Sequence, residues 1–408
     1  MIELGHRQIP ALILVCCIWG ITWPQVNTAS VSTHARELHR KAIVFDTHAD
    51  STQRLTLKGF DFFANHTDGN LDFPRMREGG LDAVFFSIWT EGTRPGPEAL
   101  KGALVQIDSV RETVRSKPGD LVLATTADEV RRAHKEGKIA ILLGVEGGHM
   151  IADDLGVLRI LASLGMRYLT LTHTSNTSWA DSSGDKAAHG GLTDFGRQVI
   201  SELNRLGVII DVSHVSDKTF DDVLAASQAP VIASHSSMRA LADHPRNISD
   251  DMLRRLAAKG GVADINYHTE FVSQLLLDAE RSMAGEMQEF ERQVKQKCGD
   301  DEICFVSEWD RIRTQLTAEG KFPEVSWNMI VEHIDHAVRV AGVDHVGLGS
   351  DFDGAWMPKG MEDVSKIPKI TEALIRKGYS DSDIMKILGG NILRVMQDVD
   401  HVAKTLRR

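Results

Sequence analysis

Six segments of the chain each place a histidine or a carboxylate immediately after a short apolar run. These segments are Asp46–Asp50, Val145–His149, Thr172–His173, Ser213–His214, Ser234–His235 and Ser350–Asp353. Imidazole nitrogens and carboxylate oxygens without thiolates form a ligand set that suits zinc, although manganese or cobalt could replace it. If the fold brings the six segments together, they predict a metal-dependent hydrolytic site.

The ligand types and their spacing indicate two metal positions. His48 and Asp50 are two residues apart, so on an extended backbone both side chains point the same way and can bind one divalent ion. His214 and His235 can hold a second ion, and Glu146 has two oxygens with which it could bridge both. Two ions about 3.5–4 Å apart would activate a shared water as hydroxide and polarise a carbonyl group. We therefore expect two Zn²⁺ ions per chain.

Two further segments supply candidates for proton transfer and for stabilising negative charge. Asp351 is placed to handle the proton, with Asp353 as the second choice, and His173 would donate a hydrogen bond to the oxygen that becomes anionic. Each residue also has a structural interpretation: the two aspartates can form a turn before Gly354, and Glu146 can cap the following helix. The joint arrangement is harder to explain structurally than any single residue, so we interpret it as a metal site.

The remaining histidines and one arginine carry weaker signals. Arg246 precedes a predicted helix cap at Ser249, and from its position alone it is interpreted as a loop cation. Five histidines have no ligand-type partner at a strand end and are interpreted as structural: His149, His189, His244, His268 and His345.

The elements that must position these residues follow from apolar runs bounded by turn residues. Eight runs are expected as strands: Ala42–Asp46, Leu81–Ile88, Ile139–Gly144, Tyr168–Thr172, Val208–Val212, Val231–Ser234, Val262–Asn266 and Val346–Gly349. Helical patterns lie between several of them, at Val157–Leu164, Gly196–Arg205, Asp217–Ala226 and Ser249–Lys259. Most runs are continuously apolar, as in strands covered on both faces. This alternation predicts an α/β fold, a (βα)8 TIM barrel of the metal-dependent hydrolase type, whose catalytic residues come from the rim at the strands' carboxyl ends.

One gap between the predicted strands is too long for a single crossover helix. The chain from Tyr267 to about Asp344 must carry the seventh helix of the barrel. We also expect a helical insertion there, over about 267–330, between strands seven and eight and near the active-site face. No second domain is required, so residues 30–408 are predicted to form a single (βα)8 metallohydrolase domain.

The N-terminus differs from the rest of the chain. Residues 9–23 (IPALILVCCIWGITW) are almost wholly apolar and follow Arg7. A run of about 15 residues is short for a membrane span, which needs about 20, and fits the core of a signal peptide. We therefore expect residues 1–29 to be a signal peptide, cleaved near Ala29, or a retained N-terminal anchor. The protein would then be exported: periplasmic, secreted or membrane-anchored at the cell envelope.

Cysteine use and net charge add two expectations. Cys298 and Cys304 lie close together in the sequence, and in an exported protein such a pair suggests a local disulfide. The alternative is two free thiols on the helical insertion.

The formal net charge of −11 and the lack of lysine or arginine runs argue against a nucleic-acid partner.

Seven motifs together resemble the membrane dipeptidase (renal dipeptidase) family of metallopeptidases. They are FDTHAD at 45–50, VEGGH at 145–149, LTHTSNTSWADS at 171–182, DVSHVS at 211–216, ASHSS at 233–237, HPRNISDD at 244–251 and GLGSDFDGAW at 347–356. The resemblance spans about Ala42 to Val399, nearly the whole predicted mature chain. It implies a binuclear zinc barrel that cleaves dipeptides and often tolerates a D-residue at the C-terminal position.

The resemblance also implies a role for each matching residue. His48 and Asp50 would bind one zinc ion, His214 and His235 the other, and Glu146 would bridge them. The substrate would be contacted by His173 and Arg246, with Asp351 as the acid/base. Arg246 thereby changes from a loop cation to the expected binder of the substrate carboxylate, a role suited to its planar fork. Members of the family are often dimers, so the resemblance also implies a homodimer. The insertion is more elaborate than the family requires, so the resemblance does not fix which substrate side chains are preferred.

Two alternatives to dipeptide hydrolysis remain open from the sequence. An amidohydrolase acting on a lactone, an N-acyl amino acid or a modified peptide of a biosynthetic pathway would use the same metal site with a different pocket. Turnover of simple dipeptides would separate the two. A binding or scaffolding protein on a retired barrel should have lost ligands, whereas all five ligand residues and Asp351 are present.

Overall fold

The computed structural model describes residues 31–299 and 302–408. The apolar run at 9–23 and the predicted cleavage position near Ala29 lie outside these residues. Within the described part of the chain, no helix combines the length and the apolar character that crossing a bilayer requires.

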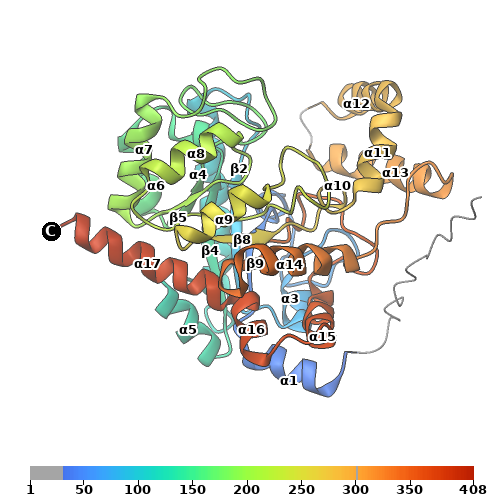
Figure 1. The fold of residues 1–408 in the computed structure, drawn as a ribbon, viewed down its shortest axis with the longest axis horizontal. Helices are drawn as coiled ribbons and strands as arrows, with labels where there is room; N and C mark the ends of the chain where they lie inside the picture. Colours follow the sequence, from blue (N-terminus) through green and yellow to red (C-terminus); the bar gives the residue numbers. More distant parts are fainter. Residues whose placement is uncertain (1–30, 300–301) are drawn as a thin grey trace, which may run out of the picture. The chain divides into compact units, whose positions relative to one another are not determined.

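Within the described residues, eight parallel strands close into a barrel (Figure 1). They are β1 (Phe45–Ala49), β2 (Ala83–Trp89), β4 (Ile139–Glu146), β5 (Met166–Thr170), β6 (Ile209–Asp211), β7 (Ile232–Ala233), β8 (Val262–Ile265) and β9 (Val346–Leu348). Each pairs with the next along the chain, and β9 pairs back to β1 through Leu348 and Asp46. The predicted (βα)8 barrel is therefore confirmed.

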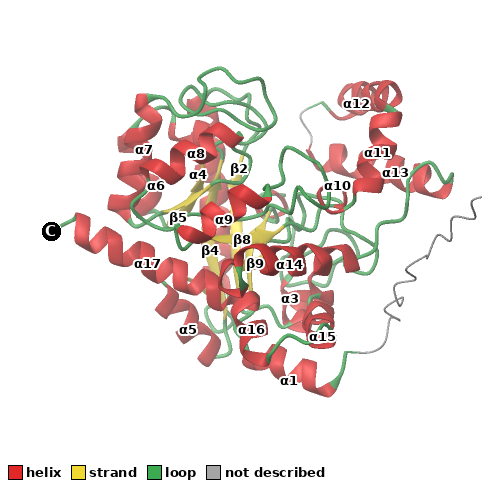
Figure 2. Ribbon diagram, viewed as in Figure 1, coloured by secondary structure: helices red, strands yellow, loops and turns green. Residues whose placement is uncertain are grey.

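Helices surround the strands, as Figure 2 shows. They are α1 (Thr33–Lys41), α2 (Thr52–Leu55), α3 (Phe73–Gly79), α4 (Gly96–Ser116), α5 (Ala127–Lys135), α6 (Leu155–Ser163), α7 (Asp194–Leu206), α8 (Asp217–Ala226), α9 (Asp250–Ala258), α14 (Asn328–Ala341), α15 (Pro368–Arg376), α16 (Asp381–Met385) and α17 (Asn391–Leu406). The four predicted helices occur as α6 to α9. Three of these begin at hydroxyl N-caps, because the side chains of Thr193, Ser216 and Ser249 each accept a backbone N–H of the first turn.

The apolar strands are covered on both faces. All eight residues of β4 are buried, and alternate side chains belong to two different apolar clusters. Leu143 and Val145 pack in the larger cluster, whereas Leu142 packs with Phe45 and Phe85. Glu146 has the same parity as Leu142, so the last residue of β4 points to the same side as that second cluster.

The largest differences from the sequence prediction are a shift of the first strand and one additional short strand. The first strand was predicted at Ala42–Asp46 but spans Phe45–Ala49, so His48 lies within it rather than after it. The apolar pattern misses this part because Thr47 and His48 are polar yet fully buried. The sequence also gave no indication of β3 (Leu121–Leu123), which pairs with β4 beside the barrel and is too short to show a pattern.

The chain between β8 and β9 contains the expected helical insertion. It carries α10 (Thr269–Val272), α11 (Gln274–Ser282), α12 (Ala284–Cys298) and α13 (Glu302–Ala318), drawn in yellow to orange in Figure 1. The next helix, α14, packs against α9, β8 and β9 and is therefore the seventh helix of the barrel. The insertion has its own apolar cluster, which includes Leu276, Val294, Trp309 and Leu316.

The two cysteines of the insertion are joined in the structure. A disulfide links Cys298 and Cys304, whose Cα atoms are 5.5 Å apart, across the connection from α12 to α13. Because the closed loop is short, we expect replacement of both cysteines by serine to cost about 2 kcal/mol at most. The loss should appear as faster amide hydrogen exchange in α12 and α13, with the barrel strands unchanged. Free thiols in the native protein, or faster exchange throughout the barrel, would contradict this expectation.

Candidate metal centre and substrate site

The barrel brings the predicted ligand residues to one rim. His48 lies in β1, and Glu146 is the last residue of β4. His214 and His235 follow β6 and β7, and Asp351 follows β9. Because all these strands are parallel, their carboxyl ends face one end of the barrel, where all five side chains are buried.

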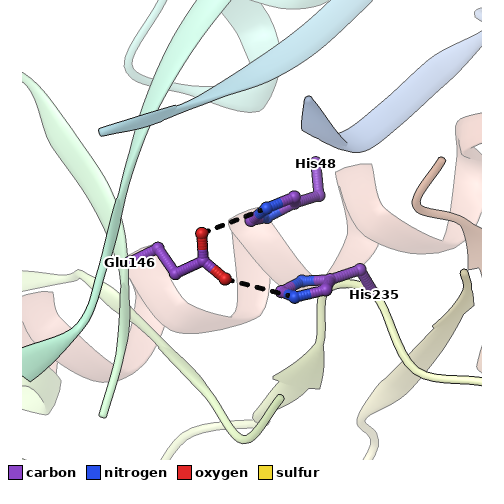
Figure 3. Close-up of side chains that lie close together, drawn as sticks. All are labelled: His48, Glu146 and His235. Carbon is purple, nitrogen blue, oxygen red and sulfur yellow. Dashed lines mark ion pairs between the residues drawn. The ribbon is translucent and has the colours of Figure 1, made fainter. Parts of the chain in front are cut away.

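The two oxygens of Glu146 face different histidines. Oε1 lies 3.0 Å from Nε2 of His214 and 3.3 Å from Nε2 of His235. Oε2 lies 3.4 Å from Nε2 of His48. Figure 3 shows the carboxylate between His48 and His235, with one oxygen turned toward each ring. This is the arrangement that a carboxylate bridging two ions requires.

The predicted ligand pairs lie on either side of Glu146. His48 Nε2 is 3.6 Å from Oδ2 of Asp50, and His214 and His235 approach each other with their Nε2 atoms 2.9 Å apart. Two imidazole nitrogens bound to one tetrahedral zinc ion lie about 3.3–3.4 Å apart, because each Zn–N bond is about 2.0–2.1 Å. The histidine pair is therefore close to the separation that a shared ion demands.

Unpartnered polar atoms show that these residues fit a cation. His48 Nε2 and Asp50 Oδ1 are buried without a hydrogen-bond partner among the residues that the structure describes. Burial raises the pKa of Asp50 to about 8, in spite of the nearby His48. Burial would also raise the pKa of Glu146, but His48, His214 and His235 together hold it well below its ordinary value. Asp50 therefore needs a further cation beside it to remain charged at neutral pH.

Hydrogen bonds from residues outside the ligand set orient two of the histidine rings. His48 Nδ1 lies 2.8 Å from the hydroxyl of Tyr168. His235 Nδ1 lies 2.8 Å from Oγ of Ser234, which in turn donates to Oδ2 of Asp211 at 2.7 Å. When each Nδ1 carries the proton, each Nε2 lone pair is directed at the cluster. No pattern in the sequence indicated a supporting role for Tyr168, Ser234 or Asp211, although the last two stand within the motifs.

Close approach to Gly144 lets Tyr168 reach His48. A Cβ atom at Gly144 would lie 1.9 Å from Cζ of Tyr168, so only glycine leaves room for the ring. The phenol of β5 therefore lies across β4 and contacts a histidine of β1. A contact of this kind cannot be read from the spacing of residues.

Asp351 occupies the site as predicted, whereas Asp353 does not. Asp351 Oδ1 lies 3.8 Å from His48 Nε2, and its Oδ2 accepts a hydrogen bond from Nδ2 of Asn266 at 2.9 Å. Asp353 accepts hydrogen bonds from the Ser51 hydroxyl and the Asn70 backbone N–H, so it holds neighbouring loops. Asn266, at the end of β8, is a further site residue that the sequence analysis did not identify.

Two residues of this site have a strained backbone conformation. His214 and Asp351 have φ values of 67° and 66°, in the left-handed region that residues other than glycine rarely adopt. Such conformations cost about 1–3 kcal/mol each and persist where the surrounding structure enforces them. Both lie in turns that follow a barrel strand, so the fold directs these two side chains at the cluster against a local preference.

Two residues with predicted substrate roles face the cluster. His173 Nε2 is 4.0 Å from Oε1 of Glu146, and its ring lies between those of Trp89 and His214. Arg246 is buried, and one Nη2 contact to the carbonyl of His235 fixes its position. Its Nε and Nη1 atoms have no hydrogen-bond partner within the described chain. Burial lowers the pKa of Arg246 to about 10, so it remains a cation near neutral pH.

The five histidines interpreted as structural have hydrogen-bond partners outside the predicted ligand set. The partners are Thr90 for His149, Thr177 for His189, the backbone N–H of Arg246 for His244, the backbone N–H of Glu270 for His268 and Gly261 for His345. None of the metal-ligand groupings found among the described residues includes any of them. Those groupings are His48–Glu146–His235, Glu146–His173–His214 and His48–Asp50–Asp351.

Comparison with known proteins supports this geometry. The family model of membrane dipeptidase (peptidase family M19) matches residues 32–408. Dipeptidase aclJ of Aspergillus oryzae is 36% identical over 358 residues, which cover 84% of this chain and 74% of that protein.

Solved structures agree with the sequence match. The probable dipeptidase PvdM from Pseudomonas aeruginosa is 30% identical with a TM-score of 0.77, covering 91% of this chain and 98% of that one. A metallo peptidase from Rhodobacter sphaeroides, liganded with a phosphinate mimic of the dipeptide L-Ala-D-Ala, is 27% identical with a TM-score of 0.71, over 88% and 99% of the two chains. With its carboxylate and imidazole groups gathered on one barrel rim, the chain belongs to the membrane dipeptidase family of metallopeptidases.

Proposed function

We propose that this protein hydrolyses the peptide bond of dipeptides and that it uses two zinc ions per chain. The observation that carries the proposal is the buried guanidinium of Arg246 beside the ligand cluster. Its Nε and Nη1 atoms lack partners in the described chain, and a buried cation with free donors calls for an anion. The free carboxylate of a short peptide satisfies this requirement through a charge-assisted, bidentate contact.

The residues of the site then have distinct tasks. Arg246 binds the C-terminal carboxylate, and His173 donates a hydrogen bond to the scissile carbonyl oxygen as negative charge develops on it. When bound, the two metal ions supply Lewis-acid activation of the water and of the carbonyl. Asp351 accepts the proton of the water and returns it to the leaving amine. Asn266 holds Asp351 in place through the hydrogen bond to Oδ2.

This arrangement predicts selection for chain length. If Arg246 holds the terminal carboxylate, the distance to the metal cluster fixes one residue beyond the cut. Dipeptides should be hydrolysed, and C-terminally amidated dipeptides should not. Arg246→Ala should lower kcat/KM for free dipeptides about ten- to a hundredfold, the scale of one charge-assisted hydrogen bond, with unchanged metal content. Kinetic assays of paired acid and amide substrates, with metal analysis, measure both effects.

A matched control for this variant is Arg254→Ala, because Arg254 is an exposed arginine on α9 with a long ion-pair contact of 4.0 Å. It should leave kcat/KM unchanged. Equal turnover of a dipeptide and its amide by the unmodified protein would contradict carboxylate recognition. That result would favour the broader amidohydrolase alternative.

Finer features of the proposal rest on the relatives and on the N-terminal sequence. We include dipeptides with a C-terminal D-residue, because the Rhodobacter sphaeroides relative was solved with a mimic of L-Ala-D-Ala. We also propose export, from the apolar run at 9–23, and a homodimer, from the family resemblance. The N-terminal peptide mass of the native protein and light scattering in solution measure these two properties.

A further inference from the structure

A buried arginine links the insertion to the barrel rim. Arg313 of α13 pairs with Glu280 of α11 at 2.8 Å and with Glu270 of α10. The side chains of all three residues are at most one-fifth exposed. The Arg313 guanidinium carbon also lies 4.0 Å from the ring centroid of Trp356, which belongs to the loop after β9. Arg313 therefore joins three helices of the insertion, α10, α11 and α13, to the loop that carries Asp351.

A row of aromatic rings leads from this arginine to the substrate site. The ring of Trp356 meets that of His268 at 5.1 Å, and His268 stacks on Phe271 at 4.6 Å. Phe271 in turn lies 5.4 Å from the guanidinium carbon of Arg246. The backbone supports the row, because the N–H of Thr269 donates to the carbonyl of Trp356 at 3.0 Å.

The same row also adjoins the proposed acid/base. The backbone N–H of His268 donates to Oδ1 of Asn266 at 2.6 Å, and Nδ2 of Asn266 donates to Asp351. Arg246 and Asp351 thus mark two sides of the space in which the residue after the scissile bond must lie. Its side chain would extend toward the apolar rings of Phe271 and Trp356 and toward the imidazole of His268 that lies between them.

We propose that this aromatic row (Phe271, His268 and Trp356) forms the subsite for the C-terminal side chain, and that Arg313 is the residue that positions it. The inference rests on the proposed dipeptide hydrolysis. It makes the insertion the element that determines specificity, with a preference for apolar and aromatic C-terminal residues. Arg313 acts through its planar group, which stacks on Trp356 while its N–H groups reach two carboxylates, and lysine cannot do both.

The test compares dipeptides that share an N-terminal alanine and differ at the C-terminus. In Arg313→Lys, KM for Ala-Phe and Ala-Leu should rise about tenfold, the scale of one lost apolar subsite contact, while KM for Ala-Gly stays within about twofold. Values of kcat and the metal content should not change. Arg311→Lys is the matched control, because Arg311 lies on the same helix with its side chain 61% exposed and should behave as the unmodified protein.

A second variant guards against misfolding of the first. Phe271→Ala removes a wall of the subsite without removing a charged group, and it should show the same split between Ala-Phe and Ala-Gly. An equal rise in KM for all three dipeptides in both variants would overturn the aromatic subsite while leaving dipeptide hydrolysis intact. Failure of the unmodified, zinc-loaded protein to hydrolyse any of the three would instead overturn the proposed function.

Discussion

Glu146→Gln is expected to lose at least one of the two metal ions and nearly all activity. The carboxylate turns Oε1 toward His214 and His235 and Oε2 toward His48, so each oxygen serves a different side of the cluster. An amide keeps one oxygen and replaces the other with an N–H group, which cannot bind a cation. One side must therefore lose its ligand, and kcat should fall by at least about 10²–10³-fold. Elemental analysis and kinetic assays of the same preparation measure both losses.

Glu136→Gln provides the matched control for this experiment. Glu136 is exposed and pairs only with Lys138, at 3.1 Å, among the ion pairs of the described residues. Metal content and kcat should match those of the unmodified protein. An unchanged metal content in Glu146→Gln would contradict the bridging role, whatever happens to activity.

Asp351→Asn is expected to abolish most activity while both metal ions stay bound. Asp351 lies at the edge of the cluster, 3.8 Å from His48 Nε2, and Asn266 already holds its Oδ2. Burial would raise the pKa of Asp351, but His235 and His48 lower it below its ordinary value, so the group is ionised and can accept a proton. Loss of a general acid/base lowers kcat about 10²–10⁴-fold. An asparagine fits the same space but cannot transfer the proton.

The metal content of this variant separates two roles for Asp351. Its carboxylate also groups with His48 and Asp50 as a set that could hold an ion. Loss of metal together with activity would make Asp351 a ligand rather than the acid/base. Asp353→Asn is the comparison, because Asp353 contacts Ser51 and Asn70 instead of the cluster, and it should keep far more of the activity.

The family and the ligand set could be predicted from the sequence because both depend on short segments of the chain. In a parallel barrel, the residues that follow each strand lie at the same rim. Each of the eight apolar runs expected as strands contributes a parallel strand, and the polar residues near its carboxyl end stand on the rim. His48, Glu146, His214 and His235 could therefore be assigned to one site from strand ends alone. The extended pairing of His48 with Asp50 also required only a two-residue spacing.

Tertiary structure decided every contact between residues distant in the sequence. Tyr168 supports His48 from 120 residues away, and it does so only because Gly144 leaves space for its ring. Asp351 and Asp353 are the same residue type and follow the same strand only two residues apart, yet packing directs one at the cluster and the other at Asn70. Such outcomes depend on which surfaces meet when the barrel closes, which no local pattern records.

The residues proposed to bind the substrate also depend partly on the sequence and partly on the tertiary structure. The sequence placed Arg246 in a loop, and only the resemblance gave it a role. The fold buries its guanidinium with free donors, whereas a loop cation would be solvated. Trp356 ends one of the seven motifs, but no pattern indicated its contacts with Arg313 and His268, because α10, α13 and the loop after β9 meet only in three dimensions. The order of residues along the chain determines the chemistry of the rim, whereas only the packing of the insertion brings the aromatic row beside Arg246.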